Sequence, residues 1–139
     1  MTPDIRLSPA GEPPAEQMAA LHEEAAAIAY AHIFSTPFPL SEARDKWGGH
    51  HDSVWLAWRG PQLVGFATAT GAELTGLYVL PREHGHGLGS ALLDAVGDVR
   101  RLWVLEDNHS GRAWYENRGW RAAGEREEVY GVWQVLYER

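Results

Sequence analysis

The stretch LYVLPREHGHGLGSALL, residues 77–93, is an apolar run that ends at a proline and passes through three alternating glycines into an amphipathic segment. This pattern predicts a strand, a tight turn and a helix. Gly85, Gly87 and Gly89 let the backbone approach a bound group closely, and the N–H groups of the first helical turn have no partner within the helix. We therefore expect the turn to bind a diphosphate at the positive end of the helix dipole.

Two common phosphate-binding loops do not fit this spacing. A P-loop needs Lys-Ser or Lys-Thr after its last glycine, but Leu88 follows Gly87 and Ser90 follows Gly89. A dinucleotide fingerprint counted from Gly85 needs Gly or Ala at position 90, and the roughly fifty residues that follow leave no room for a second βαβ half. Close packing alone could also explain such a turn, so its interpretation depends on a second motif.

The second motif is LWVLEDNHSGRAWYENRGW, residues 102–120, which predicts a strand, a capped helix and a glycine stop. Asn108 or Ser110 can cap the helix, and Gly119 fits the left-handed position that ends it. Asn108, Gly111 and Tyr115 are three and four residues apart, so they share one helix face. We expect an elongated ligand in the groove beside Gly111, between the Asn108 amide and the Tyr115 hydroxyl.

Together the two motifs resemble the GCN5-related N-acetyltransferase (GNAT) superfamily, and the resemblance extends over most of the chain. Val79-Leu80-Pro81 matches the V-x-P strand end of the family, and residues 84–89 lie on its Q/R-x-x-G-x-G/A loop, with His84 in place of Gln or Arg. The second motif follows the spacing N-x-x-A-x-x-x-Y-x-x-x-G-F, with Gly for Ala and Trp for Phe. The resemblance implies an acetyl-CoA-dependent N-acetyltransferase.

Length and composition agree with a single domain over residues 1–139, because 45% hydrophobic residues and 7 Trp can fill one core. The resemblance implies an α/β (α+β) fold with a mixed, mostly antiparallel central sheet of about seven strands and helices on both faces. From the residue patterns we expect strands at 5–7, 53–58, 63–70, 73–79, 120–124 and 129–137, besides the one that opens the second motif. Helices are expected at residues 15–31 and at residues 41–47, the second with Ser41 as its cap. Two further helices are expected, one after the glycine turn, with Val99 on its buried face, and one after Asn108.

The resemblance also implies which residues bind acetyl-CoA. Leu77 and Val79 would pair with the pantetheine amides through their backbone, as an added strand does. The complete set of expected coenzyme-binding residues is Leu77, Tyr78, Val79, His84, Gly85, His86, Gly87, Leu88, Gly89, Ser90, Asn108 and Tyr115.

The chain has no cysteine, so an acyl-cysteine intermediate is excluded and the acetyl group must pass directly to its acceptor. By the resemblance, Tyr115 is the acid that protonates the departing thiolate; its alternative role is to pack between Trp114 and Trp120. Glu73 is the base, acting through water. Its alternatives are to hold a cationic substrate or to end a strand at the surface, and water alone could also serve as the base.

The acceptor is expected to be a primary amine of a small molecule or a peptide. Aromatic side chains near the first two helices could enclose it or attract its ammonium group, and they could equally form an ordinary hydrophobic lid. The expected substrate-binding residues are Tyr30, His32, Phe34, Trp47 and Glu73, with Phe38 as a further candidate.

Other classes are disfavoured. A net charge of −7 argues against nucleic-acid binding, and neither His50-His51 nor the pair His84 and His86 has a third ligand at metal-site spacing, so no metal is expected. No apolar run could span a membrane, and the start of the chain lacks a basic signal segment, so we expect a cytoplasmic protein. A homodimer is compatible with the resemblance. The competing hypothesis is an inactive acyl-CoA-binding or sensor module with the same fold.

Overall fold

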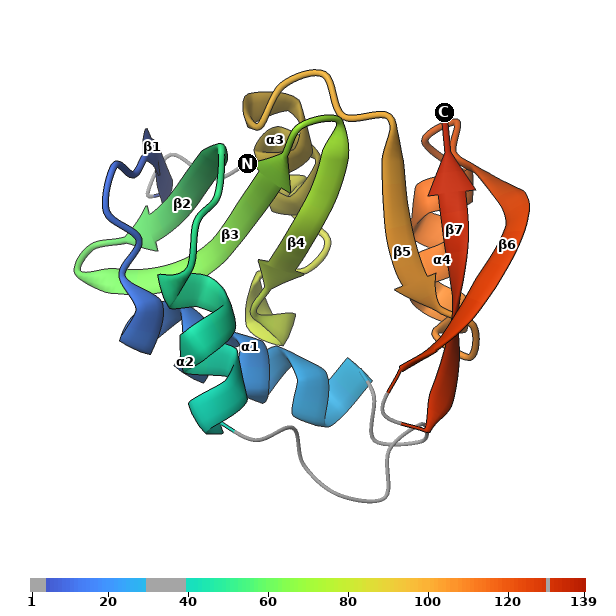
Figure 1. Ribbon diagram of the computed structural model, residues 1–139. Helices are drawn as coiled ribbons and strands as arrows, with labels where there is room; N and C mark the ends of the chain where they lie inside the picture. Colours follow the sequence, from blue (N-terminus) through green and yellow to red (C-terminus); the bar gives the residue numbers. More distant parts are fainter. Residues whose placement is uncertain (1–4, 30–39, 130) are drawn as a thin grey trace.

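The computed structural model describes residues 5–29, 40–129 and 131–139. Within these residues seven strands and four α-helices follow one another, with a short 3₁₀ helix, η1, before the glycine turn (Figure 1). Their bounds are β1 Ile5–Pro9, α1 Ala15–Ala29, α2 Leu40–Gly48, β2 Ser53–Arg59, β3 Gln62–Thr70, β4 Glu73–Val79, η1 Pro81–Glu83, α3 Leu88–Ala95, β5 Arg101–Leu105, α4 His109–Glu116, β6 Arg121–Val129 and β7 Val132–Glu138.

The strands form one mixed sheet in the order β1-β2-β3-β4-β5-β7-β6. Every neighbouring pair is antiparallel except β4 and β5, which are parallel. This parallel pair is short, because only Glu73 with Arg101 and Leu74 with Leu102 are in register. Beyond these two pairs the strands diverge, as Figure 1 shows, and among the described residues the backbone of β4 from Thr75 onward has no strand partner on that side.

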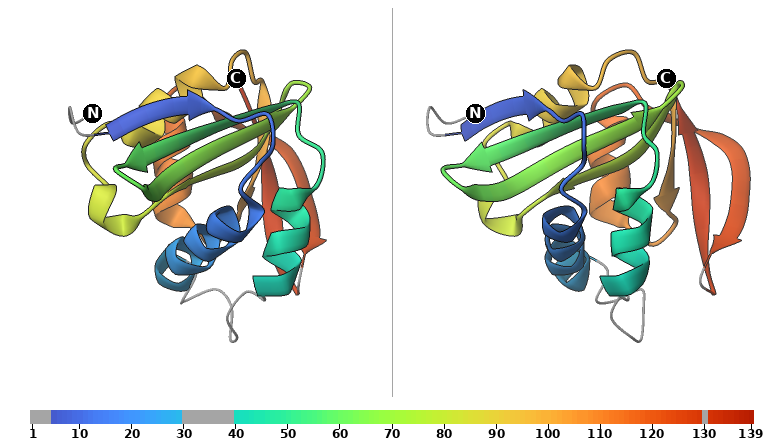
Figure 2. Two further views of the ribbon diagram at one scale, coloured as in Figure 1. Left: turned by 90° about the vertical axis from the view of Figure 1, so that its left-hand side faces the viewer. Right: turned by 60° about the vertical axis from the view of Figure 1, so that its left-hand side comes forward.

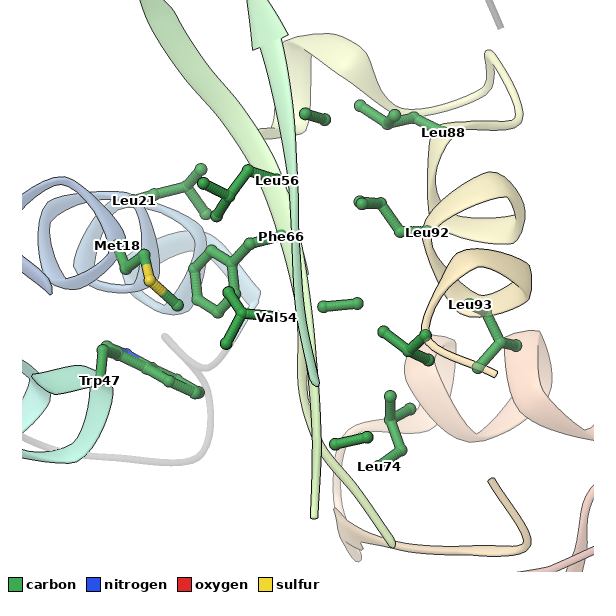
Figure 3. Packing of buried hydrophobic residues seen from close by; sticks show 14 of the residues in the cluster. Met18, Leu21, Trp47, Val54, Leu56, Phe66, Leu74, Leu88, Leu92 and Leu93 are labelled. Carbon is green, nitrogen blue, oxygen red and sulfur yellow. The ribbon is translucent and has the colours of Figure 1, made fainter. Parts of the chain in front are cut away.

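Helices cover both faces of the sheet, which confirms the predicted fold class (Figure 2). Helices α1 and α2 lie together on one face, and α3 and α4 lie on the other. In Figure 3, Met18 and Trp47 pack with Phe66 on the first side, whereas Leu88 and Leu92 of α3 pack on the second.

Strand β3 is buried over seven consecutive residues because it has helices on both sides. Its large side chain Phe66 points toward α1 and α2 (Figure 3). Gly65, on the opposite face, leaves room for α3, since a Cβ there would lie 3.1 Å from Leu92 Cδ1. This alternation brings α3, and with it the glycine turn, close to the sheet.

Some element boundaries differ from those expected. Helix α3 ends at Ala95, and Gly97 has a φ of 102°, so Val99 is buried outside the helix. The last hairpin turns at Gly131, with a φ of 79°, so β6 runs on to Val129 and β7 starts at Val132. Helix α2 begins at Leu40, one residue before the expected cap Ser41.

Among the described residues, no helix is long and apolar enough to cross a membrane.

Candidate active site

A cavity of about 1030 Å³ lies where β4 and β5 diverge. Its wall includes all of β4, the glycine turn and the first residues of α3, and one face of α4. On the other side of the sheet, side chains of α1 and α2 also line it. The cavity therefore joins the two helical layers through the opening in the sheet.

The glycine turn presents the start of α3 to this cavity. After β4 ends at Val79, η1 leads through Gly85, with a φ of 82°, to Gly87, with a φ of 78°. Gly87 is the N-cap of α3 and makes no side-chain cap hydrogen bond. The amides of the first helical turn thus have no side-chain acceptor at the cap, as an anion-binding site requires.

A buried ion pair anchors the segment before the turn. The Glu83 side chain is only 5% exposed and lies 2.6 Å from Arg59 Nη2 at the end of β2. Arg59 also donates from Nε to Glu83 Oε1 and from Nη2 to Glu83 Oε2, both at 3.0 Å. The His84 ring folds back, with Nε2 3.0 Å from the Val79 carbonyl oxygen. Both contacts tie the turn to the sheet.

Helix α4 packs against the start of α3 at Gly89. A Cβ at Gly89 would lie 3.1 Å from Trp114 Cζ2, so a larger residue would push the two helices apart. The Arg118 guanidinium lies 3.7 Å from the centre of the Trp114 ring, and its Nε donates to Ser90 Oγ at 3.0 Å. Within the described ranges Arg118 has no carboxylate partner, so it places an uncompensated positive charge beside the glycine turn.

Asn108 is the N-cap of α4, and its Oδ1 accepts from the Gly111 amide at 3.2 Å. Ser110, the other expected cap, lies inside the helix and donates to the same Asn108 oxygen at 3.4 Å. A Cβ at Gly111 would collide with the Asn108 amide group, so glycine there makes room for the cap.

Tyr115 packs against the two neighbouring tryptophans and also reaches the cavity. Its ring packs edge-on against Trp114 and Trp120, with centroid distances of 5.1 and 6.0 Å. The residue is half-buried and lines the cavity together with Asn108 and Gly111. The three residues of the predicted stripe therefore face one space.

Glu73 lies at the closed end of the β4–β5 opening. Its side chain lines the cavity and is 29% exposed, and its Oε1 is 3.4 Å from Arg101 Nε. The Glu73 carboxylate therefore lies in the cavity wall with Arg101 as its ion-pair partner.

Two residues at the α1–α2 side of the cavity were not expected from the sequence. His22 is buried, its Nδ1 accepts from Trp47 Nε1 at 3.2 Å, and its ring lies 4.3 Å from that of Tyr78. Burial, aided by the positive charge of Lys46, lowers the pKa of His22 to about 4, so the ring is neutral with its proton on Nε2. Lys46 is the second unexpected residue.

The remaining predicted residues are placed as follows. Leu77, Tyr78 and Val79 line the cavity, as do His84, Gly85, Gly87, Leu88, Gly89 and Ser90. His86 is exposed and does not line it. Trp47 is fully buried between α2 and the sheet rather than in the cavity wall, because its indole N–H is taken by His22 and its ring packs on Phe66. Tyr30, His32, Phe34 and Phe38 lie outside the described residues.

Among the residues that the structure describes, no three His, Cys, Asp or Glu side chains gather as a metal site would need.

Comparisons with known proteins agree with this architecture. The family model of the acetyltransferase (GNAT) domain matches residues 50–122. A comparison with curated proteins gives no significant match. Similar solved structures include the PaiA N-acetyltransferase of Thermoplasma acidophilum in complex with coenzyme A, with a TM-score of 0.73 and 20% identity over 100% of this chain and 99% of that one. Apo YjaB from Escherichia coli has a TM-score of 0.77 and 18% identity, covering 99% and 97% of the two chains. Arabidopsis thaliana NAA60 in complex with a bisubstrate analogue has a TM-score of 0.60 and 15% identity, covering 96% and 97%.

Proposed function

Since this chain belongs to the GNAT acetyltransferase family, we propose that it transfers an acetyl group from acetyl-CoA directly to a primary amine of a small molecule or a peptide. The observation that carries the proposal is the continuity of the cavity. A single space connects the uncapped start of α3, the Asn108–Tyr115 face of α4 and the Glu73 carboxylate through the opening between β4 and β5. Donor and acceptor could therefore meet inside the sheet from opposite faces.

The residues at the glycine turn fit a diphosphate. The amides at residues 88–90 begin a helix that has no side-chain cap, and Arg118 adds a positive charge next to Ser90. The backbone of β4 beyond Leu74 has no partner on the β5 side, so its polar groups can pair with an extended ligand. Acetyl-CoA, once bound, would supply a thioester as the acetyl donor.

Tyr115 and Glu73 would divide the proton transfers between them. Tyr115 could give its hydroxyl proton to the leaving thiolate. Glu73, which is paired with Arg101, could take the amine proton through a water molecule. Since the chain has no cysteine, these two groups serve a single direct transfer and no acyl-cysteine forms.

Thermal unfolding with and without acetyl-CoA, followed by thiol release against a panel of primary amines, tests the proposal. At about 100 times its Kd, the ligand should stabilise the fold by about 2.7 kcal/mol, and at least one amine should release free thiol. Glu73→Gln should lower kcat about tenfold or more without losing the thermal shift, whereas Glu128→Gln, on an exposed part of β6, is the matched control and should leave kcat unchanged.

Stabilisation without thiol release for any amine would favour the alternative, an inactive coenzyme-binding module. Absence of any thermal shift would refute the assignment of the cavity to acetyl-CoA.

A further inference from the structure

Lys46 is the only lysine in the sequence, and the other eleven basic residues are arginines. Among the α2 side chains that the structure describes, it is the one that lines the cavity. The chain therefore contains one side chain with a primary amine, and this amine is at the acceptor side of the cavity.

The position of Lys46 follows from its neighbour Trp47. Trp47 is fully buried and hydrogen-bonded to His22, which holds this turn of α2 against the sheet. Lys46 Nζ lies 4.6 Å from the centre of the Trp47 ring. Within the parts of the chain that the structure describes, no carboxylate comes within ion-pair distance of Nζ, so a salt bridge does not occupy the amine.

The surroundings of Lys46 favour its neutral form more than bulk water does. Loss of solvent around the ammonium lowers the pKa of Lys46, although the residue as a whole remains exposed because the cavity is open. Two titratable groups face the Lys46 ammonium. The Glu73 carboxylate opposes the lowering of the Lys46 pKa but is paired with Arg101, and His22 is neutral. A larger neutral fraction makes a lysine amine a better nucleophile.

We propose that Lys46 is itself an acetyl acceptor, so that the enzyme acetylates its own lysine from acetyl-CoA bound in the same cavity. The Nζ lone pair attacks the acetyl carbonyl carbon, a C–N bond forms and the C–S bond breaks. The proton lost by Nζ ends on the departing sulfur, so the products are acetyl-lysine and coenzyme A as its thiol. This inference rests on the proposed use of acetyl-CoA and extends it to a site of modification.

The test is mass spectrometry of the full chain after incubation with acetyl-CoA alone. The expected result is one acetyl group on Lys46, gained about tenfold or more faster than on a synthetic peptide of residues 41–51 at the same acetyl-CoA concentration, because binding holds donor and amine together. Desulfo-coenzyme A, which fills the coenzyme site without a thioester, should suppress the modification. Lys46→Arg should lose it.

Arg44→Lys is the matched control. Arg44 is exposed on the same helix, pairs with Glu16 and does not line the cavity, so a lysine introduced there should be acetylated no faster than the peptide. Equal rates at the two lysines, or a Lys46 rate that desulfo-coenzyme A leaves unchanged, would overturn the proposal in favour of ordinary chemical acetylation.

The experiment distinguishes a failure of self-acetylation from a failure of the proposed function. If acetyl-CoA stabilises the fold and an added amine is acetylated while Lys46 stays unmodified, self-acetylation is refuted and the proposed function stands. If acetyl-CoA does not stabilise the fold and no amine is acetylated, both are refuted.

Discussion

Replacing Arg59 should destabilise the protein much more than its surface position suggests. The Glu83 carboxylate is 5% exposed, whereas the Arg59 side chain is 38% exposed, so Arg59→Ala leaves a buried anion without its cation. Breaking a buried ion pair in this way costs about 3 kcal/mol or more. For a domain of this size we expect a fall of about 10 °C in Tm.

Urea unfolding followed by circular dichroism measures this loss. Arg6→Ala, an exposed arginine on β1, is the control and should change the free energy of unfolding by less than about 0.5 kcal/mol. The double variant Arg59→Met with Glu83→Leu should be more stable than Arg59→Ala, because it removes both charges together. Since Glu83 directly precedes the glycine turn, Arg59→Ala should also raise the Kd for acetyl-CoA several-fold. An Arg59→Ala variant as stable as the control, or a double variant less stable than the single one, would refute this reasoning.

Three further predictions concern the cavity. Gly87→Val should abolish the thermal shift with acetyl-CoA and cost about 1–2 kcal/mol of stability, since Gly87 has a φ of 78°. As the pH falls below 6.5, His22 takes up a proton in the unfolded chain, whereas in the folded chain it does so only near pH 4. The free energy of unfolding should therefore fall by roughly 3 kcal/mol as the pH is lowered from 6.5 to 4. His22→Gln should remove this part of the pH dependence, and an unchanged slope in urea titrations would contradict it. Arg118→Gln should raise the Kd for acetyl-CoA about tenfold at low salt and less at high salt, as calorimetry can measure. The exposed Arg121→Gln is its control, and equal affinities would exclude a role for Arg118.

The local parts of the site could be predicted from the sequence. The bounds of β4 match the expected residues 73–79, and the turn at Gly85 and Gly87 has the positive φ angles that only glycine adopts readily. Asn108 is one of the two caps that the sequence offered, and helical spacing alone predicts the shared face of Gly111 and Tyr115. In each case the deciding interactions lie within a few residues along the chain.

Residues that reach the cavity from other elements could not be predicted in this way. His22 is buried on α1 with Met18 and Leu21, but nothing local in the sequence shows that its ring meets Tyr78. The place of Trp47 is also ambiguous from the sequence, because an aromatic residue on a short helix can line a pocket or fill the core. Arg118 lies three residues after Tyr115, in the turn that follows α4, so the spacing that relates Gly111 to Tyr115 could have identified it.

Residues 77–93 and 102–120 predict the strand, glycine turn and capped helix of the expected coenzyme side, because backbone conformation and hydrogen bonds between near neighbours suffice for these. No such local pattern predicts that β4 and β5 pair at two positions and then diverge. That opening depends on the packing of α3 and α4 against one face and of α1 and α2 against the other. This packing involves residues far apart in the chain, and it brings Glu73, Tyr115 and Lys46 to one cavity.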